Sequence, residues 1–474
     1  MSPLSSSHTV ALVCDFFYPN MGGVEMHLWY LSQCLLARGH KVVVVTHAYG
    51  DRQGVRYMTN NLKVYYLPLG VAYDQVIFPT LWAFFPLFRN ILVREGVTLV
   101  HGHQSTSTLS GECIFYARTM GYPVVYTDHS LFSVSLEDGI ASVVINKILE
   151  ITLADVDHII AVSKACKSNL LERARVDGGR VPVTVIPNAV DGSKFTPDPS
   201  KRYPRDTINI VVLSRLVHRK GINLLTQIIP IVCDKFPQVH FIVGGDGPLR
   251  AMLERMCEKH TRSDLHHRVE LLGTVAHCNV RDVLVRGHLF LNCSFTESFC
   301  MALLEAASCG LFVVSTDVGG IPEVLPPSMI SLAKPNAEEV LRALEEAILI
   351  QATEQKASSF CSSSAGEKEL QVIRQRHSTV CAMYSWPEVA KSAERVYDQV
   401  QANRRDDTLL ARLRRYAIVL GPIWGLLACL LAVCMHLLWC LCDFVWPANK
   451  IERCIQFKEE EEDGEEEEED QKSR

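Results

Sequence analysis

The first half of the chain is a series of short apolar runs, rich in Val and Ile, separated by stretches with helical periodicity. Runs of this length and composition predict β-strands, and their alternation with helices predicts a parallel sheet covered on both faces. The expected strands are Thr9–Val13, Lys41–Thr46, Lys63–Leu67, Leu99–His101, Val124–Thr127, His158–Val162 and Val183–Pro187, with helices at Gly23–Arg38 and Ser105–Met120.

The pattern restarts after Asn188–Pro199, whose two Pro, two Asp and one Gly are typical of a linker. We expect two doubly wound, Rossmann-like α/β domains, at 1–190 and 191–383, facing each other across a cleft. Open parallel sheets bind ligands at the carboxyl ends of their strands, so the cleft is the expected site. The second domain should contain strands Ile208–Leu213, His240–Val243, Val269–Leu272, Leu289–Asn292, Phe312–Ser315 and Ile330–Leu332, and helices Gly221–Lys235, Pro248–His260, Val280–Arg286 and Met301–Ser308.

The C-terminal part changes character. Ala352–Glu367 is Ser-rich, and we expect a loose insertion there; 384–403 should be a crossover helix that returns to the first domain. Ala417–Cys442 contains no Asp, Glu, Lys or Arg. A helix of that length spans about 39 Å against about 30 Å of hydrocarbon, which predicts a transmembrane helix, the alternative being a buried core helix.

Charge orients this helix. Five arginines precede it, fewer basic residues follow it, and the N-terminus has no basic region or apolar run of signal-peptide length. We expect a single-pass protein with cytosolic catalytic domains and a lumenal tail, 443–474. Seventeen cysteines without a Cys-x-x-Cys spacing fit the reducing cytosol. The arginines are Arg404, Arg405, Arg412, Arg414 and Arg415.

The net charge of -6 is dominated by the acidic run Glu459–Asp470. Without its eleven acids, 42 acids stand against 47 bases. That slight positive balance suits anionic substrates or an anionic membrane surface, and it is far too small to indicate nucleic-acid binding.

Two motifs suit a phosphate-bearing ligand. Gly22 and Gly23 stand between a strand and a helix, where backbone amides can approach an anion, although turns use Gly-Gly freely. Arg215 and Lys220 follow strand Ile208–Leu213 and suit the two phosphates of a nucleoside diphosphate, the alternative being solvated loop cations. Gly245, in the Gly-rich turn after the next strand, should add a second backbone cradle.

Glu297 and Glu305 are the strongest signal. Glu297 stands just before an expected helix that opens at Phe299, Cys300 and Met301, and Glu305 follows about two turns later. Carboxylates at a helix N-terminus are also common as partners of the helix dipole.

Several histidines and aspartates have competing interpretations. His129 ends one strand, and His101 and His103 end another; lone histidines are more often structural. Asp155 and Asp157 imitate a metal-binding Asp-x-Asp, but they stand where a helix gives way to a strand. We therefore predict no catalytic metal and no cofactor, because Arg215 and Lys220 already neutralise a leaving group.

In this order and spacing the motifs resemble the retaining nucleotide-sugar glycosyltransferases of the GT-B fold, over about residues 8–400. The resemblance implies that Glu297 contacts the donor sugar, that Glu305 holds the ribose, and that His129 lies near the reacting sugar. It also implies that the amides of Phe299, Cys300 and Met301 face the diphosphate.

Further segments narrow the resemblance to one family, the catalytic subunits of phosphatidylinositol N-acetylglucosaminyltransferase. They are Asp15–His27, Ser214–Gly221, Gly287–Asn292, Glu305–Gly310 and Val318–Leu325, together with the C-terminal anchor. The resemblance implies a retaining, front-face hexosyltransferase that uses UDP-N-acetylglucosamine (UDP-GlcNAc) and phosphatidylinositol. It also implies the first step of glycosylphosphatidylinositol (GPI) anchor biosynthesis at the endoplasmic reticulum membrane, within a multi-subunit complex. The alternatives are another membrane-bound GT-B transferase, such as a GDP-mannose-dependent mannosyltransferase, and a non-catalytic scaffold subunit.

The segment Tyr73–Arg94 is rich in Phe, Leu and Trp and includes Pro79 and Pro86. It suits either a half-buried core helix or an interfacial element that brings the domain to a lipid headgroup.

Overall fold

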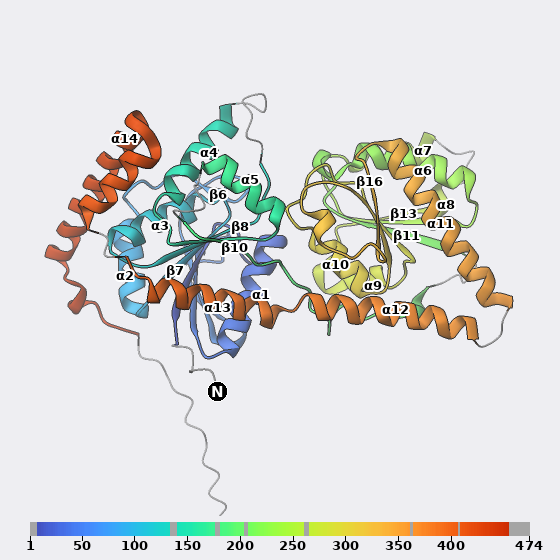
Figure 1. Cartoon of the computed structure of the whole chain (residues 1–474), viewed down its shortest axis with the longest axis horizontal. Helices are drawn as coiled ribbons and strands as arrows, with labels where there is room; N and C mark the ends of the chain where they lie inside the picture. The colour runs from blue at the N-terminus through green and yellow to red at the C-terminus, as the bar shows by residue number, and fades with distance from the viewer. Residues whose placement is uncertain are drawn as a thin grey trace, which may run out of the picture.

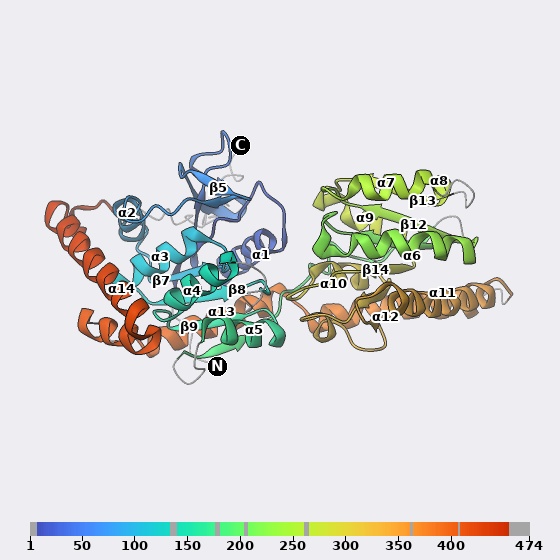
Figure 2. The ribbon, with the colours of Figure 1, turned by 90° about the horizontal axis from the view of Figure 1, so that it is seen from above.

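The computed structural model describes residues 7–132, 140–175, 181–202, 207–259, 265–360, 364–405 and 408–454. The acidic run Glu459–Asp470 lies outside the described residues. Two α/β halves stand side by side, and a long C-terminal helix lies on the far side of the first half (Figures 1 and 2).

The N-terminal half is built on an eight-stranded sheet of order β10-β9-β8-β7-β1-β2-β4-β3. All its pairs are parallel except β3 with β4. The predicted strands are confirmed to within two residues at each end. The strands are β1 Thr9–Val13, β2 Lys41–His47, β3 Gly54–Met58, β4 Leu62–Leu67, β7 Leu99–His103, β8 Val124–Asp128, β9 His158–Ala161 and β10 Val183–Val185, beside a small hairpin of β5 Val71–Tyr73 and β6 Val76–Ile77.

The C-terminal half is built on a six-stranded, fully parallel sheet of order β13-β12-β11-β14-β15-β16. Its strands again match the prediction because parallel strands are buried on both faces and are therefore continuously apolar. They are β11 Ile208–Leu213, β12 Val239–Gly244, β13 Val269–Gly273, β14 Leu289–Asn292, β15 Phe312–Thr316 and β16 Ile330–Ala333.

Helices cover both faces of each sheet (Figure 2). Apolar side chains of sheets and helices form the cores, with Leu28 and Leu31 on the first sheet and Leu225 and Ile228 on the second, all nearly inaccessible to solvent. The helices are α1 Gly23–Ala37, α2 Phe85–Glu95, α3 Thr108–Thr119, α4 Ile140–Leu153, α5 Lys164–Ala174, α6 Ile222–Lys235, α7 Arg250–Lys259, α8 Leu265–Arg268, α9 Val280–Leu284 and α10 Met301–Ser308, followed by α11 Ala337–Phe360, α12 Ser364–Met383, α13 Trp386–Ala402 and α14 Leu409–Val445.

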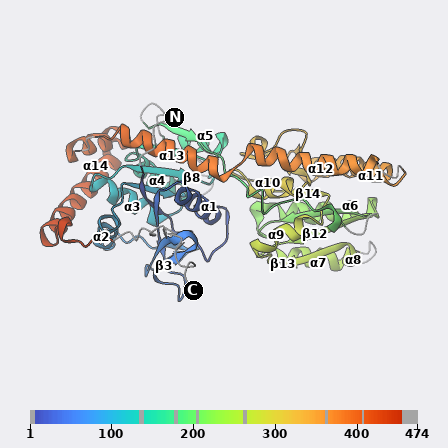
Figure 3. The same cartoon turned by 90° about the horizontal axis from the view of Figure 1, so that it is seen from below.

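The loose insertion predicted at Ala352–Glu367 is wrong. Helix α11 continues to Phe360 and α12 begins at Ser364, so the two helices form a long pair along the C-terminal half (Figure 3). The buried stripe that includes Val340, Leu344 and Ile348 anchors α11, and packing therefore extends the helix where Ser-rich composition predicted a loop.

The predicted crossover helix is α13, which returns the chain to the N-terminal half (Figure 3). Its buried face contributes Glu394, which accepts hydrogen bonds from Arg38, and Tyr397, whose hydroxyl lies 2.8 Å from Nδ1 of His101. Asp398 lies 2.8 Å from Nε2 of His8.

Helix α14 contains the one stretch within the described residues that is long and apolar enough to cross a membrane. It is not one straight helix: Gly421 leaves the helical region at φ 74° and ψ −175°, and Pro422 follows it. Proline cannot donate to the preceding turn, so the break has a direct chemical cause.

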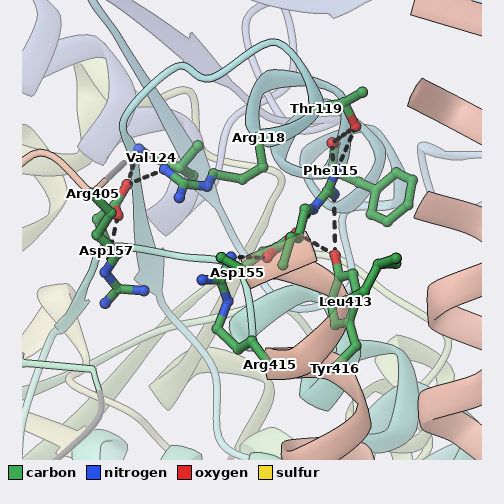
Figure 4. A network of polar contacts seen from close by, with 12 residues as sticks. Phe115, Arg118, Thr119, Val124, Asp155, Asp157, Arg405, Leu413, Arg415 and Tyr416 are labelled. Atoms are coloured by element: carbon green, nitrogen blue, oxygen red, sulfur yellow. Dashed lines mark hydrogen bonds and ion pairs between the residues drawn. The ribbon is translucent and has the colours of Figure 1, made fainter. Parts of the chain in front are cut away.

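The arginines before the apolar stretch mostly contact the chain's own N-terminal half (Figure 4). Arg412 Nε and Arg415 Nη2 lie 2.6 Å and 2.8 Å from the carboxylate of Asp155. Arg405 pairs with Asp157 at 3.6 Å, and Arg404 donates to the carbonyl of Gly121. Because these arginines dock α14 onto the N-terminal half, their number is weaker evidence for the orientation of α14 in a membrane.

The far end of α14 also rests on the N-terminal half. Arg89 contacts Asp443 at 2.5 Å, and the amide of Cys454 donates to the carbonyl of Arg94 at 2.8 Å. In this packing α14 lies along the domain instead of projecting from it.

Candidate active site

One large cavity of about 1720 Å³ lies between the two halves and is lined from both. It brings together the sequence-predicted residues of both domains, with one exception discussed below. The lining includes Gly22, Gly23, His129, Arg215, Lys220, Glu297, Phe299, Cys300, Met301 and Glu305.

Lys220 is placed by a glycine turn. Gly221, which follows it, has φ 72°, and a Cβ there would lie 1.8 Å from the carbonyl oxygen of Cys293. Only glycine fits so close an approach in a left-handed conformation. The turn brings the Lys220 ammonium onto the Glu297 carboxylate, and the Ser294 hydroxyl donates to the same carboxylate at 2.8 Å.

The loop that carries Glu297 is held by both halves. The amide of Gly320 donates to the Glu297 carbonyl at 2.9 Å, and the Ser298 hydroxyl donates to the carbonyl of His129 in the other half. Cys300 then adopts φ 65°, which non-glycine residues rarely do, and α10 begins at Met301. Strain of this kind is typical of functional sites and here turns the start of α10 towards the cavity.

Basic side chains gather on the same wall. Arg215, His218, Arg219 and Lys220 all line the cavity. Burial lowers the pKa of Arg219, and the neighbouring Arg215 lowers it further. Glu25 lines the cavity opposite them, and burial raises the pKa of its carboxyl while Arg215 opposes that shift. The positive field that these cations produce suits an anionic ligand.

The two predicted glycine cradles differ. Gly22 is the residue before the first turn of α1, and both Gly22 and Gly23 line the cavity. Gly245 is the exception: the cavity lining does not include it, and its amide donates to the carbonyl of Gly273 at 2.7 Å. It therefore does not offer its amide to a phosphate in this structure, and it packs instead against Ser214, beside Arg215.

His129 belongs to a buried cluster of three histidines that also contains His27 and His103. Nδ1 of His103 lies 3.2 Å from Nε2 of His129, and Nδ1 of His27 lies 2.8 Å from the side-chain oxygen of Asn188. Burial lowers the pKa of His27 to about 4 and also lowers the pKa values of His103 and His129 well below the ordinary value for histidine. All three rings are thus neutral at physiological pH, and His129 can offer the cavity a hydrogen bond but no charge.

Two histidines at the site, His27 and His277, were not predicted from the sequence. His27 stands inside α1, where nothing local distinguishes it from a core histidine. His277 lines the cavity with its Nε2 3.6 Å from the Glu305 carboxylate, while Lys194 lies 2.8 Å from its Nδ1. Both partners are distant in sequence, so no spacing rule could have found them.

The Asp-x-Asp pair is structural. Asp155 accepts hydrogen bonds from Arg412, Arg415 and Tyr416, and Asp157 accepts from Arg118 and from the amide of Val124. Burial would raise the pKa of Asp155, but the arginines outweigh burial and leave it lowered. A carboxylate occupied by guanidinium groups is poorly placed to bind a divalent cation.

The comparisons with known proteins agree with this geometry. Residues 47–136 match the family model PIGA (GPI anchor biosynthesis), and residues 207–349 match the model Glycosyl transferases group 1. Among solved structures, sucrose-phosphate synthase from Thermosynechococcus elongatus superimposes with a TM-score of 0.67 at 21% identity, covering 83% of this chain and 99% of that one. The Anabaena protein Alr3699/HepE in complex with UDP gives 0.61 at 16% identity, covering 82% and 100%. These likenesses identify the GT-B fold.

Two curated relatives are much closer in sequence. A phosphatidylinositol N-acetylglucosaminyltransferase subunit from Arabidopsis thaliana is 49% identical, over 94% of this chain and 93% of its own. The Homo sapiens protein of the same name is also 49% identical, over 90% and 83%. With its GT-B fold and cleft, the chain belongs to the PIGA family of phosphatidylinositol N-acetylglucosaminyltransferase subunits.

Proposed function

We propose that this protein transfers N-acetylglucosamine from UDP-GlcNAc to phosphatidylinositol, with retention of configuration at the anomeric carbon. This reaction would be the first step of GPI-anchor biosynthesis. The proposal is supported by the relatives, which are named as subunits of this transferase. The match to the Arabidopsis thaliana relative covers more than nine-tenths of that protein.

The observation that carries the proposal is the contact of Lys220 with Glu297 in the interdomain cavity. A cation suited to a diphosphate and a carboxylate suited to sugar hydroxyls are thereby held at one point. Arg215 and Arg219 line the same wall and would stabilise the negative charge that develops as UDP departs. Glu305 lies farther along α10, where it would hold the ribose hydroxyls with His277 beside it.

Retention is proposed to follow a front-face route. Glu297 is bonded by Lys220 and Ser294, an arrangement that suits holding a donor hydroxyl better than attacking the anomeric carbon. His129 is neutral, because burial lowers its pKa, and it would hydrogen-bond the sugar from the other half. The inositol hydroxyl then attacks on the face from which UDP leaves, and the departing phosphate accepts its proton.

The rival donor is GDP-mannose. A phosphatidyl-myo-inositol mannosyltransferase of Mycobacterium tuberculosis is 22% identical over 82% of this chain, far below the identity of the GlcNAc-transferase subunits. Competition binding to the purified protein separates the two donors. We expect UDP-GlcNAc to displace labelled UDP and GDP-mannose to fail; the reverse order would contradict the proposal. A scaffold without catalysis would bind neither donor productively, and Glu297→Ala would then leave cellular GPI output unchanged.

We further propose that the enzyme works on the cytosolic face of the endoplasmic reticulum membrane, where nucleotide sugars are supplied, with other subunits of the transferase. The word subunit in the relatives' names supports the complex. The apolar stretch in α14 supports membrane attachment. No catalytic metal is part of the proposal, because cationic side chains line the site where a metal would otherwise act.

A further inference from the structure

We propose that the active-site cavity extends into an apolar arm that binds an acyl chain of the lipid acceptor. The inference takes from the proposed function that the acceptor is a lipid. It adds the site that would bind the acyl chain of that lipid. The arm is defined here by the lining residues Phe115 and Tyr116 of α3, Ile145, Ile148, Leu149 and Thr152 of α4, and Leu431 of α14.

One face of α4 forms the wall of this arm. Ile145, Ile148, Leu149 and Thr152 follow the i, i+3, i+4, i+7 spacing that places side chains on a single helix face, and Ile151 beside them also lines the cavity. Ile148 is 55% exposed, so it stands at the open edge of this wall. The neighbouring Val143 and Val144 do not line the cavity and are 37% and 50% exposed. A surface helix with apolar residues on its outer face as well as its inner one is unusual in contact with water and suits contact with lipid.

The arm reaches α14. Leu431 stands in the middle of the apolar stretch of α14, whose neighbours Ala428 and Ala432 pack with Ala154 at the end of α4. Lys147 of α4 also lies over the ring of Trp424 at 5.8 Å. One end of the cavity is therefore walled by α14, the apolar helix that packs on the N-terminal half, and the other by the basic wall at Lys220.

The arm is chemically suited to a hydrocarbon chain. Two carboxylates line the cavity beside the arm, and both are engaged: Glu112 accepts from the Leu81 amide at 2.9 Å and from Thr80, and Asp155 is paired with Arg412 and Arg415. Polar groups reappear nearer the donor, where the Gln104 amide donates to the Ser130 hydroxyl at 2.9 Å. Such groups suit a polyol headgroup. The cavity therefore changes from polar near the donor to apolar in the arm, as a phospholipid acceptor changes from its inositol headgroup to its acyl chains.

The size of the cavity supports a second ligand. A single small-molecule site usually occupies roughly 300–1,000 Å³. The cavity measures about 1720 Å³, which leaves room beyond a nucleotide sugar. The exposed Leu81 and Trp82, at 67% and 40%, lie on the loop before α2 and also line the cavity, so the loop would contribute to the lipid-facing rim.

The test compares acceptors with and without acyl chains. The full chain with its associated subunits is reconstituted in phosphatidylcholine vesicles, and transfer to dioleoyl phosphatidylinositol is compared with transfer to glycerophosphoinositol. Ile145→Trp should lower the ratio of the two kcat/KM values at least about tenfold, since each buried methylene contributes a factor of about four. Val144→Trp, one residue away and outside the arm, is the matched control and should leave the ratio unchanged. An unchanged ratio in Ile145→Trp, or an equal fall in both variants, would overturn the proposal.

A second measurement avoids the risk that a tryptophan prevents folding. Phosphatidylinositol with a photoactivatable group on its acyl chain should label the wild-type chain at Ile145–Thr152 and Leu431, and excess unlabelled phosphatidylinositol should abolish the labelling. Labelling confined to Val143 and Val144, without competition, would mean bulk lipid contact only and would contradict the arm. If the proposed function itself is wrong, the wild-type protein will transfer GlcNAc to neither acceptor. That result differs from every outcome that contradicts the arm alone.

Discussion

Lys220 and Glu297 form an ion pair although they stand on different loops of the C-terminal half. The pair lies in the cavity between the halves, beside the Ser298 hydroxyl, which reaches across to the His129 carbonyl. A donor that places its diphosphate on Lys220 and its sugar on Glu297 would be held at both ends of the bond that breaks. If the proposed function holds, the ion pair marks the place where the reaction would occur.

Lys220→Ala should reduce turnover by about 100- to 1000-fold, the usual effect of removing one preorganised charge from the transition state. The protein should still fold, because Lys220 lies on the cavity wall and not in a core. Lys235→Ala is the matched control, since its pair with Glu345 lies on the outer surface of the same half. Near-normal turnover of the Lys220 variant in a microsomal assay would remove this lysine from the site.

Activity should persist in EDTA. Arg215, Arg219 and Lys220 line the cavity and, in the proposed mechanism, would supply the positive charge that a divalent cation would otherwise place on the leaving diphosphate. The assay is transfer by microsomes dialysed against the chelator. Loss of activity that manganese, magnesium or zinc restores would contradict the metal-free mechanism. With zinc, the candidate ligands to substitute next would be His27, His103 and His129.

Asp155→Asn should release α14 from the N-terminal half. The substitution leaves Arg412 and Arg415 without their charged partner in a buried site, and breaking such a pair costs about 3–5 kcal/mol. We expect faster proteolysis near residues 403–409 with donor binding retained. Glu339→Gln, which breaks an exposed pair with Arg342, should leave the digestion pattern unchanged. Equal digestion rates for Asp155→Asn and wild type would show that Asp155 does not dock the helix.

The C-terminus should be protected in sealed microsomes while an N-terminal tag is digested. Each large apolar side chain moved from water into hydrocarbon gains about 1.5–3 kcal/mol, and Ile423, Leu426, Leu430 and Leu441 are among those exposed on α14. The pair of Arg89 with the half-exposed Asp443 opposes this, because the Arg89 side chain is only 3% exposed and would be left buried without its charged partner, at a cost of about 3–5 kcal/mol. The summed gain of the four apolar side chains exceeds that cost. Digestion of a C-terminal tag would instead mean that α14 lies along its own domain on the cytosolic side.

The parallel strands were predictable because a strand buried on both faces leaves a continuous apolar run in the sequence. Strand β3 was missed because it is the antiparallel edge strand, where Val55 and Tyr57 are exposed and no such run exists. The break in α14 could have been predicted from Gly421-Pro422, two poor helix formers in succession.

The cavity residues Lys220, Glu297 and Glu305 could be predicted because each follows a strand at the same edge of one sheet. The histidine cluster and the Asp155 network could not. His27 contacts His129, which lies on a different element. Asp155 contacts Arg412, which is 257 residues away in the sequence. Such contacts depend on tertiary packing, which leaves no local spacing in the sequence. In the segment Tyr73–Arg94, Phe85 and Phe88 lie in the core, as the half-buried helix predicted, while Phe78, Leu81 and Trp82 are exposed. The contact with a lipid headgroup stays a prediction.

Transfer of radiolabel from UDP-GlcNAc into phosphatidylinositol tests the central claim most directly. Microsomes from cells that lack their own member of the PIGA family should regain the activity when this chain is expressed, and Glu297→Ala should not restore it. The account predicts a labelled lipid that phosphatidylinositol-specific phospholipase C cleaves and that carries α-linked N-acetylglucosamine. Labelled product from GDP-mannose but not from UDP-GlcNAc, or full activity in the Glu297 variant, would contradict it.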